Sequence, residues 1–455
     1  MNLSSTIAVL ALAVIVVSAT GRIRETTGGW PACDTNPNVT QWSGYFDING
    51  TSKKTSKSYF YWAFSPRSGN ASAPVILWMT GGPGCSSSLA ILAENGPCHV
   101  NETTAQLYNN PYSWNTDAYV IYIDQPAGVG FSYGGSDSYD SNEAQVSHDM
   151  YYFLQGFFKV HTDLQNNEFF VVGESYGGHF APATAYRVMQ GNQNNDGVKI
   201  NLAGLAIGNG LTDPYIQYTS YPDLAYNWCQ EQLGTPCVSY STYQQMLATV
   251  PGCQASIAGC MQNNSIDCDL AGMNCNGLID AYEQTGLNVY DIRKQCDGAL
   301  CYNFNGAITF MNRADVQAAL GAKPTTWTPC SDMVNGMFSS DWFKDFNYTV
   351  PALMDNGVRV LVYNGDDDFI VNWIGSKNWT TALQWSKQAE FQQAPDRPII
   401  INTLVSALVR SVSSATSPIQ FSFMQVHGAG HMVPMDQPRT ALYMISKFVS
   451  NLNFI

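Results

Sequence analysis

The sequence contains a pentapeptide with the residue types of a nucleophile turn, Gly173-Glu174-Ser175-Tyr176-Gly177. The apolar run Phe169–Val172 before it predicts a buried strand, and the stretch after it, free of proline until Pro182, predicts a helix. Glycines on both sides allow a sharp turn that exposes the serine hydroxyl, and the start of the helix offers N–H groups to an oxyanion. The motif predicts Ser175 as a nucleophile, with a chance match as the alternative.

A serine nucleophile needs a histidine as its general base. In α/β-hydrolase sites the order along the chain is serine, then acid, then histidine. Of the six histidines, only His427 and His431 come late enough, and both follow the strand predicted over Gln420–Val426. The residue pattern alone leaves both histidines as candidates.

The acid of such a site lies just beyond a late strand. An apolar run, Val358–Tyr363, predicts that strand, and three consecutive aspartates, Asp366–Asp368, follow it. Adjacent aspartates also occur in solvated turns, but their position after a buried strand favours a catalytic role. Spacing does not choose among the three.

A second oxyanion donor is expected after an earlier strand. The run Val75–Met79 reads as a buried strand that ends in Thr80-Gly81-Gly82. A glycine pair in this place is where an α/β-hydrolase site has the other half of its oxyanion hole, and the alternative is an ordinary glycine-rich turn.

Strands and helices alternate along the first half of the chain, which predicts an α/β fold with a mostly parallel sheet covered on both faces. From about Asp213 to Ser340 the composition shifts to Cys, Tyr, Gln and Asn, which indicates an inserted segment over the site. We therefore expect a core of residues 20–212 and 341–455 and a cysteine-rich insertion of residues 213–340. Further elements are predicted at Trp42–Phe46, Tyr59–Phe64, Tyr119–Ile123, Ser141–Val160, Leu202–Ile207 and Pro438–Leu452.

The 455 residues carry a net charge of -14, which argues against nucleic acid as a partner. The apolar run Thr6–Val17 and the small residues after it predict a signal peptide over residues 1–19, although no basic residue precedes the run. The run is too short for a typical membrane anchor, so none is expected.

Twelve cysteines without a C-x-x-C spacing favour disulfides over zinc. Beyond the predicted signal peptide, seven sequons add to the case for a glycoprotein of the secretory pathway. They begin at Asn38, Asn49, Asn70, Asn101, Asn263, Asn347 and Asn378.

Several long motifs occur in the order found in serine carboxypeptidases, and the chain resembles that family from about Trp42 to Pro438. The motifs are Leu77–Ser87, Glu94–Pro97, Asn110–Trp114, Asp124–Tyr133, Gly173–Pro182, Gly208–Gly210, Asn364–Trp373 and Gly430–Pro434. The resemblance implies an α/β-hydrolase fold with an insertion. It also implies Asp368 as the acid, His431 as the base, and the backbone N–H groups of Gly82 and Tyr176 as oxyanion donors. It implies no metal and no organic cofactor.

The resemblance further implies a clamp for the C-terminal carboxylate of a peptide. Glu94 and Glu174 match the two glutamates of the family, and Gly81 offers a backbone N–H. Thr80 stands where the family usually has Asn, so a single hydroxyl replaces an amide there. Two adjacent carboxyls cannot both ionise easily, so one stays protonated and donates to the substrate in acid. Peptidase activity should then fall as the pH rises.

The resemblance also implies six disulfides. Cys33–Cys98 and Cys229–Cys237 are assigned because these four cysteines are left once the other eight are paired. The others are Cys85–Cys330, Cys253–Cys275, Cys260–Cys268 and Cys296–Cys301.

We expect a serine carboxypeptidase that acts on peptide C-termini at acidic pH, in a lysosome or vacuole or outside the cell. One alternative is an esterase or acyltransferase on the same fold, which the presence of Glu94 and Glu174 disfavours because such substrates lack a terminal carboxylate. Another is a binding role towards a partner enzyme. A homodimer is also compatible with the sequence.

Overall fold

The structure is a computed structural model that describes residues 13–17, 21–48, 55–262, 265–298 and 300–455. Most of the predicted signal peptide and the sequons at Asn49 and Asn263 lie outside the described residues. No helix in the described ranges is long and apolar enough to cross a membrane.

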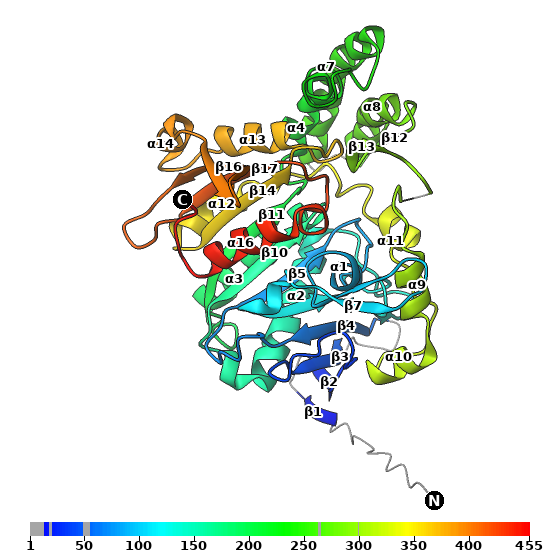
Figure 1. The fold of residues 1–455 in the computed structure, drawn as a ribbon, viewed down its shortest axis with the longest axis vertical. Helices are drawn as coiled ribbons and strands as arrows, with labels where there is room; N and C mark the ends of the chain where they lie inside the picture. The colour runs from blue at the N-terminus through cyan, green and yellow to red at the C-terminus, as the bar shows by residue number, and fades with distance from the viewer. Residues whose placement is uncertain (1–12, 18–20, 49–54, 263–264, 299) are drawn as a thin grey trace, which may run out of the picture.

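A 13-stranded sheet runs through the described chain (Figure 1). Its centre is parallel and follows the spatial order β8 (Tyr119–Ile123), β5 (Val75–Thr80), β10 (Phe169–Glu174), β11 (Leu202–Gly208), β14 (Arg359–Gly365) and β17 (Phe421–Val426). Antiparallel strands extend both edges: β1 (Ala13–Val17), β2 (Gly21–Thr27), β3 (Gln41–Ile48), β4 (Lys57–Phe64) and β9 (Tyr133–Gly134) on one side, and β16 (Leu404–Val412) and β15 (Arg397–Ile401) on the other.

Helices cover both faces of the sheet because its central strands are apolar on both sides. In β10, Phe169 and Val171 belong to one buried cluster, and Phe170 belongs to another. The first cluster includes α2 (Glu143–Val160), α3 (Gly177–Asn194) and α12 (Thr349–Asp355). The second includes α1 (Ser88–Ala93) and α16 (Pro438–Val449), whose Phe448 ring lies 5.7 Å from that of Phe170. This is the α/β-hydrolase arrangement, so the expected fold class is confirmed.

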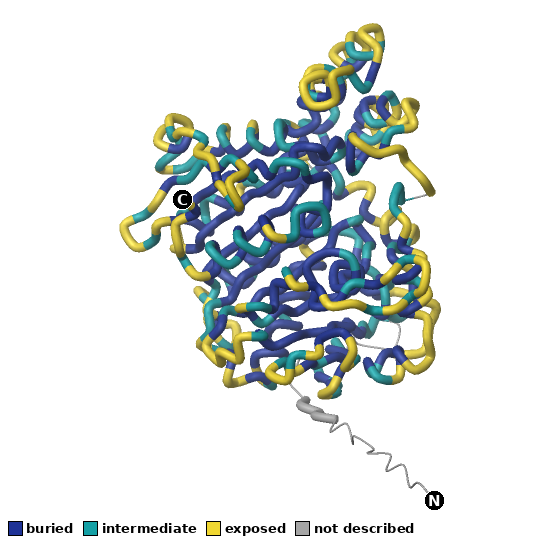
Figure 2. Tube along the Cα trace, in the orientation of Figure 1, coloured by how far each residue is buried: buried dark blue, intermediate teal, exposed yellow. Residues whose placement is uncertain are grey.

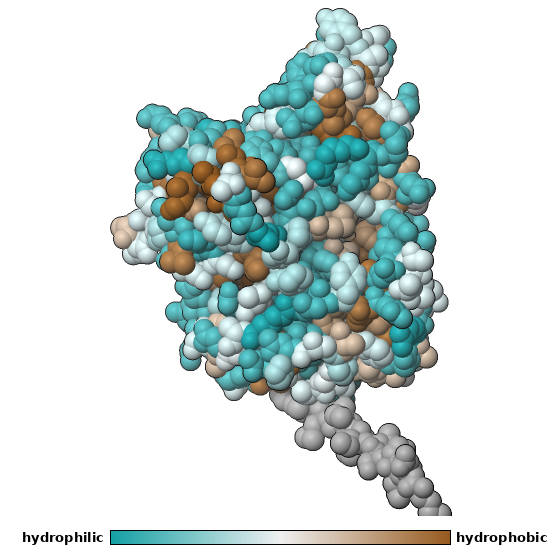
Figure 3. Space-filling view, in the orientation of Figure 1, coloured by the Kyte–Doolittle hydropathy of each residue, from teal (hydrophilic) through white to brown (hydrophobic). Residues whose placement is uncertain are grey.

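The predicted strands and helices are present with small shifts at their ends, and the apolar pattern missed the hairpin β15–β16. Its residues Ile400, Leu404 and Val405 are exposed and so break the pattern of a buried strand. Figure 3 shows apolar surface over the region of β16. Smaller elements of the core are β6 (Cys98–Val100), β7 (Leu107–Asn109), α13 (Trp373–Ala382), α14 (Gln388–Gln393) and α15 (Val433–Asp436).

The segment between β11 and α12 is mainly helical. Its α7 (Tyr240–Met261) and α8 (Ser265–Glu283) form a hairpin that projects from one end of the molecule and is largely exposed (Figures 1 and 2). The disulfides Cys253–Cys275 and Cys260–Cys268 join these two helices. The remaining elements are α4 (Pro214–Gln217), α5 (Tyr221–Asp223), α6 (Cys229–Leu233), β12 (Leu287–Asn288), β13 (Asp291–Gln295), α9 (Asn305–Met311), α10 (Ala314–Ala319) and α11 (Asp332–Met337). The limits of an insertion at residues 213–340 stay a prediction.

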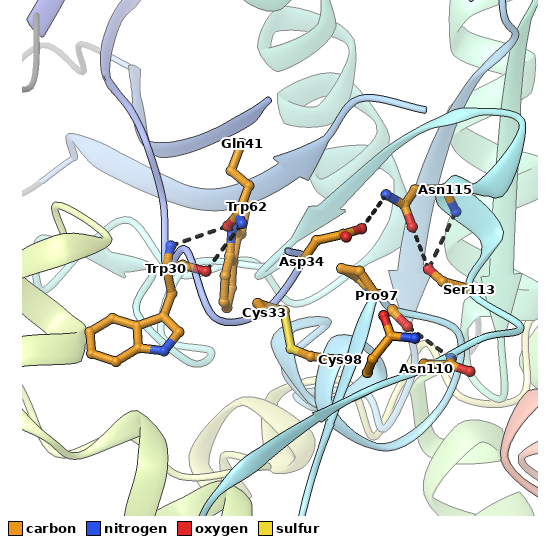
Figure 4. The surroundings of a disulfide bond; sticks show 12 residues. Trp30, Cys33, Asp34, Gln41, Trp62, Pro97, Cys98, Asn110, Ser113 and Asn115 are labelled. Atoms are coloured by element: carbon orange, nitrogen blue, oxygen red, sulfur yellow. Dashed lines mark hydrogen bonds between the residues drawn. A yellow bond between two sulfur atoms is a disulfide. The ribbon is translucent and has the colours of Figure 1, made fainter. Parts of the chain in front are cut away.

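Six disulfides are present, in the pairings that the family resemblance implies. Cys33–Cys98 ties the entry of β3 to β6 (Figure 4). Next to it, Asp34 accepts a hydrogen bond from the Asn115 amide at 3.1 Å and pairs with Arg67 at 2.8 Å. The bond therefore lies within a polar network that joins segments far apart in sequence.

We expect removal of this disulfide to lower the free energy of unfolding by about 4 kcal/mol, because Cys33 and Cys98 are 65 residues apart and the bond closes a long loop in the unfolded chain. Denaturant titration of Cys33→Ala/Cys98→Ala would measure the loss. The matched control is Cys296→Ala/Cys301→Ala, whose separation of 5 residues predicts about 2 kcal/mol. Equal losses in both double variants would contradict the loop-closure explanation.

Candidate active site

The predicted nucleophile turn is present between β10 and α3. Ser175 has φ +64°, a left-handed conformation that is strained for a residue with a side chain. Its N–H donates to Gly208 O at 3.1 Å, and its carbonyl accepts from the N–H groups of Gly178 and Leu211 at 2.9 and 3.0 Å. A Cβ atom on Gly173 would lie 2.2 Å from Gly177 O, which explains the glycine two residues before the serine. The neighbours thus hold the serine in its strained position.

His431 and Asp368 form a buried pair. His431 Nδ1 lies 2.7 Å from Asp368 Oδ2, and the Asp368 side chain is fully buried. The Asp368 carboxylate also accepts from the Ile370 N–H at 3.1 Å. The His431 N–H donates to Tyr290 O at 2.8 Å, which fixes the backbone of the histidine loop. A carboxylate held in this way can orient an imidazole and stabilise its protonated form.

Asn209 is a further site residue, which the sequence motifs left without a role. Its Nδ2 donates to Asp368 Oδ2 at 2.8 Å, and its Oδ1 accepts from the Gly365 N–H at 3.0 Å. The side chain therefore links the end of β11 to the acid and to the end of β14. The signal was present in Gly208-Asn209-Gly210, a motif directly after a buried strand.

The other late histidine and aspartates lie apart from this pair. His427 Nδ1 contacts Asp366 Oδ2 at 2.6 Å, and this hydrogen bond raises the pKa of His427. Asp367 forms an ion pair with Arg293 at 3.1 Å. Each of the three adjacent aspartates thus has its own partner, a distinction that spacing cannot make.

Ser175 and His431 line the same cavity, of about 90 Å³. Four more predicted site residues, Thr80, Gly82, Glu94 and Glu174, line it with them, and the rest of its wall is mainly apolar. The complete lining is Thr80, Gly82, Cys85, Leu89, Glu94, Glu174, Ser175, Tyr290, Leu300, Tyr302, Phe304, Cys330, His431 and Met432. Asp368 lies behind His431, and Gly81 is not part of the lining. Tyr176 lines an adjoining space together with Gly82 and Ser175.

The Gly81-Gly82 turn lies directly against the nucleophile turn. A Cβ atom on Gly81 would lie 2.3 Å from Tyr176 N, so only glycine permits this approach of the two backbones. Among the backbone hydrogen bonds found outside helices and strands in the described residues, the N–H of neither Gly82 nor Tyr176 takes part as a donor. Two N–H groups beside the serine can therefore serve an oxyanion.

Glu94 and Glu174 are both 2% exposed and form a hydrogen-bonded pair. Burial raises the pKa of Glu94 to about 7. The hydrogen bond from Glu174 and the charge of His431 act in the opposite direction but are the smaller effects. Burial and the neighbouring Glu94 charge raise the pKa of Glu174 well above its usual range. The pair therefore retains a proton in acid. One oxygen of each carboxyl has no hydrogen-bond partner among the described residues.

Thr80 stands at the end of β5, beside this pair in the cavity wall. The indole Nε1 of Trp78 donates to its hydroxyl oxygen at 2.8 Å. Because the oxygen already accepts this bond, the Thr80 proton can be donated to a ligand in the cavity. Threonine is shorter than the asparagine usual in the family, but its hydroxyl can still donate one hydrogen bond to a ligand in the cavity.

Comparisons with known proteins identify one family. A family model described as serine carboxypeptidase matches residues 31–451. Serine carboxypeptidase 3 of Oryza sativa is 39% identical over 410 residues, covering 89% of this chain and 78% of the relative. Carboxypeptidase Y of Komagataella phaffii is 38% identical over 416 residues, covering 90% and 76%. The crystal structure of Kex1, a prohormone-processing carboxypeptidase from Saccharomyces cerevisiae, has the same fold, with a TM-score of 0.77 at 24% identity over 91% of this chain and 92% of that one.

Proposed function

The chain belongs to the serine carboxypeptidase family of peptide-bond hydrolases, and we propose that it releases single C-terminal residues at acidic pH through an acyl-enzyme. One observation supports this most directly: a strained serine and a histidine share one small cavity with a buried carboxyl pair whose pKa values are raised. The first two residues fit acyl transfer, and the pair fits recognition of a free carboxylate.

In this proposal, Ser175 attacks the carbonyl carbon of the last peptide bond. His431 accepts the serine proton and then donates it to the leaving amine, while Asp368 fixes the imidazole through the 2.7 Å contact. The N–H groups of Gly82 and Tyr176 bind the oxyanion. A water molecule, activated by His431, then attacks the acyl-enzyme carbonyl and releases the shortened peptide.

The carboxyl pair would hold the substrate terminus. In its protonated form, Glu94 or Glu174 donates a hydrogen bond to the substrate carboxylate, and the Thr80 hydroxyl adds a second donor. Gly81 does not line the cavity. Its contribution would be to let the Gly81-Gly82 turn lie against the backbone of Tyr176, so that Gly82 and Tyr176 can both donate to the oxyanion. When the pair loses its proton, its negative charge repels the substrate carboxylate.

The rest of the cavity wall indicates which side chains the C-terminal residue of the substrate can have. Leu89, Leu300, Phe304 and Met432 line the cavity beside the carboxyl pair, and its lining among the described residues includes no lysine or arginine. Apolar C-terminal residues of moderate size suit this wall best, since burying them releases water from apolar surface.

The disulfides fit the secretory pathway, and we propose a lysosome, a vacuole or the outside of the cell as the final place. The sequons at Asn38, Asn70, Asn101 and Asn378 are exposed and suit glycosylation. Asn347 suits it less, because its Nδ2 donates to Asp213 at 2.7 Å. A homodimer or a complex with a partner enzyme stays a prediction.

The deciding experiment compares a blocked dipeptide with its C-terminal amide between pH 4 and pH 8. The pKa of Glu94 is raised to about 7, so Glu94 is protonated in acid and loses its proton as the pH rises through about 7, while the pKa of Glu174 is also raised well above its usual range. We expect kcat/KM for the free acid to be highest in acid and to fall about tenfold per pH unit once the required proton is lost.

The amide should be a poor substrate at every pH. The Ser175→Ala variant measures the background hydrolysis that does not depend on the serine. Equal rates on acid and amide across the range would mean that the pair does not bind the terminus. An esterase or acyltransferase would then explain the site better.

A further inference from the structure

Tyr176, the residue after the nucleophile, has a side chain that is anchored far from its backbone. The ring is 1% exposed, stacks on His179 with centroids 4.4 Å apart, and lies 5.3 Å from the ring of Trp342. Its hydroxyl donates to Asp341 Oδ2 at 3.2 Å. The ring therefore has a polar contact at its far end as well as packing along its faces.

Asp341 is itself held from two directions. Its N–H donates to Phe338 O at 2.9 Å, and its Oδ2 accepts from the N–H of Glu143, the first residue of α2, at 3.3 Å. It lies on the wall of a cavity of about 780 Å³ that contains neither Ser175 nor His431. The carboxylate thus connects the ring of Tyr176 to α2 from outside the candidate active site.

This anchor has a mechanical consequence for the nucleophile turn. Ser175 is strained at φ +64°, and the peptide that follows it carries the Tyr176 N–H. An oxyanion donor is effective only when it is held near its final position before the reaction. The hydrogen bond at the hydroxyl end adds a directional restraint to the packing of the ring, and so resists rotation of that peptide.

We propose that Asp341 is a positioning residue that holds the oxyanion N–H of Tyr176 through the tyrosine hydroxyl. The inference rests on the proposed function, which assigns that N–H to the oxyanion. Asp341 contacts neither the substrate nor the reacting atoms, so its effect reaches the reaction only through Tyr176.

The test uses Tyr176→Phe, Asp341→Ala and the double variant, with kcat and KM measured per active serine titrated by a phosphonofluoridate. We expect each single variant to lower kcat about tenfold with KM within about twofold, and the double variant to lower kcat no further. Asp341→Asn retains an oxygen that accepts from the tyrosine and should restore kcat to within about twofold of the wild type.

Asp345→Asn is the matched control, because Asp345 lines the same cavity and its carboxylate accepts from the Asn347 N–H rather than from Tyr176. It should leave kcat within about twofold. Single-variant effects that multiply in the double variant, or a kcat unchanged in Tyr176→Phe, would overturn the proposal.

The rate at which the phosphonofluoridate labels Ser175 separates this inference from the proposed function. Its phosphoryl oxygen uses the same oxyanion donors, so labelling should slow about tenfold in Tyr176→Phe and Asp341→Ala. A wild type that is labelled but releases no C-terminal residue would refute the proposed function, and its labelling rates would still decide the role of Asp341.

Discussion

Replacing Ser175 by alanine is expected to lower kcat for C-terminal hydrolysis by about 10⁶-fold, because no acyl-enzyme can form without the hydroxyl. The turn should survive the change, since the hydrogen bonds that hold residue 175 come from its backbone. Thermal unfolding should therefore shift by only a few degrees. Progress curves at high enzyme concentration, with the release of a terminal amino acid as the signal, would measure the residual rate.

His431 and His427 provide a variant and its control for this test. His431→Ala should lower kcat to a similar extent, and the double variant Ser175→Ala/His431→Ala should lose little more, because the two residues act as one unit. His427→Ala should stay within about threefold of the wild type, since His427 contacts Asp366 and does not line the cavity. A large loss in His427→Ala, with His431→Ala unaffected, would mean that the base has been misassigned.

Replacing Asp368 by asparagine is expected to lower kcat by about 10⁴-fold with a small effect on KM, as in a serine protease triad whose acid becomes an amide. The amide is the same size as the carboxylate. However, it lacks the negative charge that stabilises the imidazolium, and it can present an N–H to His431 Nδ1 and so favour the wrong tautomer. The Ile370 N–H, which donates to the other carboxylate oxygen, Oδ1, should keep the side chain in place.

Asp366→Asn is the control for this prediction. It makes the same chemical change two residues away, in a carboxylate that holds His427 at 2.6 Å. We expect kcat within about fivefold of the wild type and a lowered pKa for His427, which NMR titration of its ring protons would report. Equal losses of kcat in the two variants would point to general damage to this loop rather than to a specific role for Asp368.

The pairing of Glu94 with Glu174 could not be predicted from local sequence patterns. Glu174 belongs to the nucleophile motif, but Glu94 follows a short helix in another part of the chain, and no local pattern joins them. The family resemblance suggested that both bind a carboxylate. Their burial, their hydrogen bond and their raised pKa values depend on the tertiary fold, which brings the end of α1 and the end of β10 to one cavity.

The sequence by itself determined the parts of this protein that depend on neighbours along the chain. The run from Phe169 into the serine turn and the Gly81-Gly82 turn were predictable because strand, glycine turn and helix follow one another within a few residues. The parallel sheet was predictable from the alternation of apolar strands and helices. The hairpin β15–β16 was not, because its partly exposed strands lack that pattern.

Only the tertiary structure decided which polar groups meet. Asp368 and His431 are 63 residues apart, Asn209 lies 159 residues from Asp368, and Tyr176 lies 165 residues from Asp341. Composition and spacing left three aspartates and two histidines, since all of them follow strands at the same edge of the sheet. The choice among them depends on distances of a few ångströms, which are set by how the loops beyond β11, β14 and β17 pack against one another.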